Sequence, residues 1–110
     1  MAIQFVAIKK SQTAKPLRIH ICDDDGTPVN LTNAGEVRCQ IFDGYTGQLI
    51  SHEPSPILSP TDGLVEYRFT GSEPFTSGDY LMHFMIDTSD GLFFYPSFDY
   101  IRLKVIEVLP

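Results

Sequence analysis

The stretch from residue 76 to residue 96 constrains the fold most, because it predicts two β-strands joined by a tight turn. Asp90 and Gly91 stand between two apolar runs, and Asp-Gly is a preferred central pair of hairpin turns in which both residues take positive φ. Side chains of the first run alternate between two faces, with Tyr80, Met82, Phe84 and Ile86 on one face and Leu81, His83 and Met85 on the other. A strand that is apolar on both faces belongs at the centre of a structure, where its second face is covered by the same chain or by a partner.

Strand patterns recur along the rest of the chain, and helical periodicity is nearly absent. Besides the hairpin, the expected strands cover residues 3–8, 16–22, 36–42, 48–53, 64–69 and 100–107. Turn residues such as Asp62-Gly63 separate them. Pro54, Pro56 and Pro60 mark a sheet edge or a loop, because proline cannot donate a ladder hydrogen bond. Seven or eight short strands with regular turns predict an all-β fold, an antiparallel two-sheet sandwich.

Length and charge limit the organisation and the partners of the chain. The 110 residues suit one hydrophobic core, so we expect a single β-sandwich domain over 1–110. Eight Lys and Arg against 14 Asp and Glu disfavour binding to nucleic acid. No apolar run approaches the roughly 20 residues of a membrane span, and the amino-terminal charges follow the apolar residues, the reverse of a secretory signal. We expect no nucleic-acid or membrane partner, folding in a cytoplasm, and Cys22 and Cys39 reduced.

Side chains that could support metal binding or catalysis are scattered. His20, His52 and His83 lack zinc-ligand spacing, although His20 and His83 would approach each other if their strands were neighbours. The run Asp23-Asp24-Asp25-Gly26 offers carboxylates for calcium but lacks the spacing and closing Glu of an EF-hand, so it predicts an aspartate-capped turn. No nucleophile elbow or phosphate-binding loop is present. We expect no cofactor, no metal site and no enzymatic activity.

Aromatic side chains crowd the segment around Pro96, and alternation cannot bury all of them on one face. Either a subset faces a partner, or the second sheet and the Pro96 loop cover them within the chain. We favour a partner. The candidate interface combines the second face of the central strand with this aromatic segment. Its residues are Leu81, His83 and Met85 from the strand, and Phe93, Phe94, Tyr95 and Phe98 from the segment.

Several short motifs, taken in order, resemble a known family. They are Asp25-Gly26-Thr27-Pro28-Val29-Asn30-Leu31-Thr32, the alternating strand 37–42, Asp62-Gly63-Leu64-Val65-Glu66-Tyr67, and Thr76-Ser77-Gly78-Asp79-Tyr80 leading into the long strand. This order, over roughly residues 15 to 107, resembles the immunoglobulin-like amino-terminal domain of phage baseplate upper proteins and related virion β-sandwich modules. The resemblance implies an immunoglobulin-like fold, a place in the virion after synthesis in the host cytoplasm, and contacts with other virion structural proteins or with copies of the chain itself. The resemblance leaves open whether the chain is a tail or baseplate component or a decoration of the head surface.

Two functions from different classes follow from these observations. The first is a non-catalytic structural protein of a phage particle, which assembles by burial of its central strand face and its aromatic segment. The second is a carbohydrate-binding module that stacks a surface glycan on Tyr45, Tyr95 or Tyr100. Sugar-binding surfaces often use tryptophan, and the chain has none, which favours the structural protein.

Overall fold

Nine β-strands account for the regular structure in the described part of the chain. The structure, a computed structural model, describes residues 5–9, 16–23, 25–70, 73, 75–96 and 100–106. The strands are β1 (Phe5–Lys9), β2 (Leu17–His20), β3 (Glu36–Asp43), β4 (Leu49–Pro54), β5 (Ile57–Ser59), β6 (Leu64–Tyr67), β7 (Gly78–Thr88), β8 (Gly91–Tyr95) and β9 (Ile101–Ile106).

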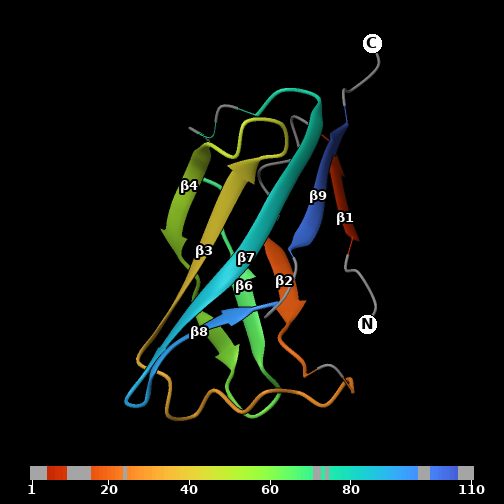
Figure 1. Ribbon diagram of the computed structural model, residues 1–110. Coiled ribbons are helices and arrows are strands. Elements are labelled where there is room, and N and C mark those ends of the chain that lie inside the picture. Colours follow the sequence, from red (N-terminus) through yellow and green to blue (C-terminus); the bar gives the residue numbers. More distant parts are fainter. Residues whose placement is uncertain are drawn as a thin grey trace.

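The strands form two sheets of unequal size. The large sheet has the order β1-β9-β7-β3-β4, and β8 pairs with β7 beyond the end of β9; the small sheet has the order β2-β6-β5. Figure 1 shows β7 running the length of the large sheet, between β3 and β9, with the small sheet behind it. The all-β two-sheet sandwich expected from the sequence is therefore confirmed.

One hydrophobic core lies between the sheets. The small sheet contributes Ile19, Val65 and Tyr67, and the large sheet contributes Val37, Cys39, Ile41, Tyr80, Met82, Phe84, Ile86, Ile101, Leu103 and Val105. Every one of these positions alternates with an outward residue, as a half-buried strand requires. The expected facing of β7 is confirmed, because Tyr80 to Ile86 are buried at every second position and Leu81, His83 and Met85 point outward.

Two expectations about the strands were wrong. The number of strands exceeds seven or eight because Ile57–Ser59, between two prolines, forms β5, the edge of the small sheet. Three residues are too few to show an alternating pattern. The sandwich is also not wholly antiparallel, since β1 pairs with β9 in parallel. That pairing joins the two ends of the described chain, and no local pattern specifies it.

The hairpin is present, but its turn differs from the expected one. Thr88 pairs with Gly91, so Ser89 and Asp90 are the central residues, and neither has positive φ. Gly91 takes the positive φ, at 125°. The Thr88 hydroxyl accepts a hydrogen bond from the Asp90 amide at 3.2 Å and donates one to the Gly91 carbonyl at 2.9 Å. These two bonds stabilise a turn in which Asp90 does not need positive φ.

The corner before β7 is held by Tyr80. The Tyr80 ring is buried, and its hydroxyl accepts a hydrogen bond from the Thr76 amide at 2.9 Å and donates one to the Thr76 carbonyl at 3.1 Å. A buried tyrosine hydroxyl needs such partners. The corner therefore fixes where β7 enters the sheet, and hence which of its side chains point outward.

Candidate functional site

A cluster of rings occupies the outer face of the large sheet, the side turned away from the small sheet. His83 stacks on Tyr100 with ring centroids 5.2 Å apart and an interplanar angle of 24°. Phe42 meets His83 edge-on at 5.3 Å, and Phe94 lies 5.0 Å from the same ring. We call the outward residues Phe42, Leu81, His83, Met85, Phe94 and Tyr100 the aromatic face.

Strand pairing brings these residues together from three strands and from the residue that precedes β9. Phe42 on β3 lies opposite Leu81 on β7, and Phe94 on β8 lies opposite Met85. Along one edge of β7, β8 pairs with the residues that follow His83 and β9 pairs with the residues that precede it. Phe94 on β8 and Tyr100, just before β9, therefore both contact the His83 ring. Residues far apart in the sequence thus form one continuous apolar surface.

A hydrogen-bonded row crosses the same face beside the rings. The Gln40 side chain lies between two histidines, because Gln40 is paired with both His52 and His83 across the ladder. Its Nε2 donates to His52 Nδ1 at 2.9 Å, and its Oε1 accepts from His83 Nε2 at 2.5 Å. Burial among the rings lowers the pKa of His83 below its ordinary value. A neutral His83 therefore packs as one more ring of the aromatic face.

The aromatic face is apolar where an outer sheet face is ordinarily polar. Phe94 is 42% exposed, and the neighbouring Leu92, which also points outward from β8, is 55% exposed. Antiparallel sheets usually place polar side chains on the face that water covers. Contiguous exposed apolar groups on a folded chain mark interaction sites.

The structure divides the expected interface residues into two groups. Leu81, His83, Met85 and Phe94 lie together on the aromatic face. Phe93 and Tyr95 point to the opposite side of β8, where Tyr95 packs against the core and Phe93 is 55% exposed. Phe98 lies outside the described residues. The sequence argument missed Gln40 and Phe42, although both continue the outward alternation that begins at Glu36.

The remaining polar candidates lie elsewhere. His20 is on β2 of the small sheet and His83 is on β7 of the large sheet, so the two rings do not share a sheet face. Asp25 caps its own turn by accepting a hydrogen bond from the Thr27 amide at 2.9 Å, and that bond lowers the pKa of Asp25.

Cys39 is fully buried and Cys22 is half-buried; both are free thiols. Burial raises the pKa of Cys39.

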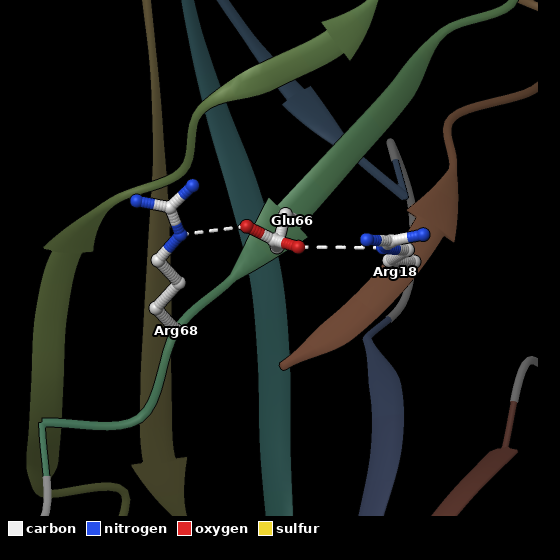
Figure 2. Close-up of polar contacts among 3 residues, drawn as sticks. All are labelled: Arg18, Glu66 and Arg68. Carbon is white, nitrogen blue, oxygen red and sulfur yellow. Dashed lines mark hydrogen bonds and ion pairs between the residues drawn. The ribbon is translucent and has the colours of Figure 1, made fainter. Parts of the chain in front are cut away.

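The outer face of the small sheet is closed by charged side chains instead of rings. Glu66 on β6 accepts a hydrogen bond from Arg68 Nε at 2.6 Å and another from Arg18 Nε at 3.3 Å (Figure 2). The two arginines extend over the carboxylate from either side, so the Glu66 side chain is only 5% exposed while theirs are about two-thirds exposed. The two outer faces of the sandwich therefore differ in chemistry: one is ionic, the other aromatic.

The Glu66 ion pairs predict a pH-dependent stability. The hydrogen bond from Arg68 is the main cause that holds the pKa of Glu66 below its ordinary value of 4.5. A carboxyl whose pKa is lower in the folded state stabilises the fold above pH 4.5 and loses that contribution as the pH falls through the folded value. We expect Glu66→Gln to be less stable than the wild type at pH 6, with the difference shrinking toward pH 3. Urea unfolding at both pH values measures it; an unchanged difference would contradict the role of the Glu66 charge.

The three tyrosines considered for sugar stacking do not form a shared surface. Tyr45 is 88% exposed in the turn between β3 and β4, Tyr95 packs against the core, and Tyr100 stacks on His83 on the aromatic face. Tyr95 and Tyr100 therefore point to opposite sides of the large sheet. A sugar ring cannot stack on both.

Comparison with known proteins supports the fold alone. No family model matches the sequence, and no curated protein sequence matches it significantly. Among solved structures, CopC from Methylosinus trichosporium OB3b is similar, with a TM-score of 0.57 and 15% sequence identity over 100% of this chain and 89% of that chain. A likeness at this identity concerns the arrangement of strands, and it agrees with the immunoglobulin-like sandwich expected from the sequence.

The described residues contain neither a metal-ligand cluster nor a membrane-spanning helix. Within the described ranges, no three His, Cys, Asp or Glu side chains are grouped so that they could hold a metal ion. The same part of the chain contains no helix with the length and apolar character needed to cross a membrane.

Proposed function

We propose that this chain is a non-catalytic structural protein of a phage particle, either a tail or baseplate component or a head-surface decoration. It assembles with other structural proteins of the particle, or with copies of itself, through the aromatic face. The observation that carries the proposal is the exposed apolar surface on the outside of the large sheet, where Phe94 and Leu92 extend the half-buried rings around His83. The place in a virion rests on the resemblance of the turn and strand motifs to virion β-sandwich modules.

Burial of a few rings suffices for specific binding by such a surface. Protein interfaces concentrate their binding energy in a few aromatic anchors, each worth about 2 kcal/mol or more, surrounded by groups that exclude water. Phe94 and Tyr100 are such anchors, and both rings pack against the ring of His83. Gln40 fixes His83 in turn, so the surface is preformed before a partner arrives.

The free thiols agree with folding in a reducing compartment such as the cytoplasm of a host cell. Cys39 lies in the core and behaves as a small apolar side chain. A protein made there and then built into a particle needs no disulfide for its stability.

Light scattering tests the proposal. The purified chain is measured alone and after mixing with the proteins encoded beside it. We expect a complex of defined mass, formed by copies of the chain or with one of those proteins. A stable monomer that binds none of them would overturn the assembly role, and saccharide binding on a glycan array would instead favour a carbohydrate-binding module.

A further inference from the structure

The amide of Gln40 lies between two histidine rings on the outer face of the large sheet. Gln40 on β3 is in register with His52 on β4 and with His83 on β7. One end of the amide bonds to His52 Nδ1 at 2.9 Å, and the other end bonds to His83 Nε2 at 2.5 Å. All three side chains are half-buried, so water replaces a broken bond only in part. We call Gln40, His52 and His83 the histidine row.

An amide cannot bond to both rings in the same way. Its oxygen only accepts hydrogen bonds and its nitrogen only donates them, so one of the two ring nitrogens must carry a proton and the other must not. Turning the amide over exchanges the two roles and keeps this rule. With the oxygen toward His83, both neutral rings carry their proton on Nε2; with the oxygen toward His52, both carry it on Nδ1. An intact row therefore requires the same tautomer in both rings.

The same rule limits the intact row to one positive charge. An imidazolium ion carries a proton on both ring nitrogens, so it can only donate. A single charged ring donates to the amide oxygen while the neutral ring accepts from the amide nitrogen. When both rings are charged, one of them turns an N–H group toward the amide NH2 group, and that hydrogen bond is lost. Protons on His52 and His83 therefore compete for one acceptor, the Oε1 atom of Gln40.

The surroundings of the row also disfavour a second proton. Arginines are the charged groups nearest to it in register, and the other outward charges of β3, β7 and β9 lie at least four positions away. These groups are, in that order, Arg38 and Arg102, then Glu36, Asp79, Asp87 and Lys104. The ion pair of Arg38 with Glu36 measures 3.0 Å. The rings of Phe94 and Tyr100 pack on His83 without bringing a charge, and burial lowers the pKa of His83. We therefore expect His83 to take up its proton after His52.

We infer that the histidine row is a pH-sensitive latch, which holds His83 in the aromatic face when closed and releases it when both rings are charged. The latch is closed at neutral pH, because the pKa of His83 lies below its ordinary value of 6.5. It opens as the pH falls through the folded pKa of His83, where the second proton binds and one bond to Gln40 is lost. Phe94 and Tyr100 then lose the fixed ring on which they pack. The inference names a regulation of the aromatic face, and its consequence for docking rests on the proposed function.

Nitrogen NMR of the imidazole rings in the free chain tests the latch. A titration from about pH 8 downward follows the tautomer and the protonation of each ring, with His20 on β2 as the internal reference. The variants are His52→Leu, Gln40→Leu and the combination of both, and thermal unfolding establishes the pH range in which each is folded. The wild-type tautomers and the His52→Leu titration decide the matter even if Gln40→Leu does not fold.

We expect His52 and His83 to show the same tautomer when both are neutral. In His52→Leu the competing ring is gone, so the proton affinity of His83 rises at least about tenfold. In the Gln40→Leu background the same replacement has little effect, because the amide that couples the rings is absent. Direct repulsion between the rings, which are two strand spacings or about 10 Å apart, would survive the loss of the amide.

Three results would contradict the latch. Different tautomers in the two neutral rings would mean that one bond to Gln40 is missing. An unchanged proton affinity of His83 in His52→Leu would leave burial as the whole cause of its lowered pKa. An effect of His52→Leu that persists without the amide would assign the coupling to direct repulsion. Each of these results concerns the free chain, so the proposed function would stand; a chain that binds nothing in light scattering would overturn that function whatever the tautomers are.

Discussion

Phe84→Ala is expected to lower the free energy of unfolding by about 3–5 kcal/mol. Phe84 is fully buried at the middle of β7, where it lies opposite Cys39 on β3 and Tyr95 on β8. Truncation removes the buried ring and leaves a cavity that both sheets line. Since small domains have only about 5–15 kcal/mol of stability, the variant would lose a large fraction of its total. Urea unfolding followed by circular dichroism measures the change.

Met85→Ala is the matched control for that prediction. Met85 is the next residue of the same strand and points to the aromatic face, where it is only half-buried. Its truncation is expected to cost less than about 1.5 kcal/mol, because water already reaches part of the side chain. Equal losses for the two variants would show that the outer face of β7 is as tightly covered within the chain as the inner face.

Phe94→Asp is expected to abolish assembly while the chain stays folded. The ring is 42% exposed on the aromatic face, so aspartate is tolerated in the free chain. In the assembled state the same substitution would bury an unpaired carboxylate at the centre of the contact, which costs several kcal/mol. We expect at least a hundredfold weaker association by light scattering or sedimentation, with an unfolding midpoint close to that of the wild type.

Leu58→Asp is the matched control for the assembly prediction. Leu58 is 39% exposed on β5, in the small sheet, so the change in chemistry and in exposure is nearly the same. It is expected to leave assembly unchanged. If both variants failed to assemble, the effect would come from added charge. If Phe94→Asp unfolded the chain, the ring would belong to the core and its role in docking would be lost.

The sequence was sufficient to predict which side chains point inward and which point outward along a single strand. Apolar residues at every second position predicted the inward and outward sets of β7 correctly, and the corner bond from the Thr76 amide to the Tyr80 hydroxyl is also local. Both features depend on neighbours in the sequence. β5 was missed because three residues between prolines show no period, and the hairpin turn was placed one residue too late because Thr88 stabilises an alternative turn.

The candidate site was predicted only in part, since it depends on which strands are neighbours. The sequence places Phe93, Phe94 and Tyr95 side by side, yet alternation on β8 sends Phe94 to the aromatic face and the other two to the opposite side. Phe42 and Tyr100 join His83 only through the pairing of β3 and β9 with β7. The Glu66 ion pairs likewise need β2 and β6 as neighbours, although the outward facing of Arg18 follows from the sequence pattern.

Hydroxyl-radical footprinting of the free and the assembled chain tests most directly whether the aromatic face is the docking surface. Met85, Phe94 and Tyr100 report on the aromatic face, and Leu58 on the small sheet is the internal reference. Docking through the aromatic face predicts that the first three lose reactivity severalfold on assembly while Leu58 keeps its reactivity. Unchanged reactivity of Met85 and Phe94 in the assembled state, or protection of Leu58 in their place, would contradict it.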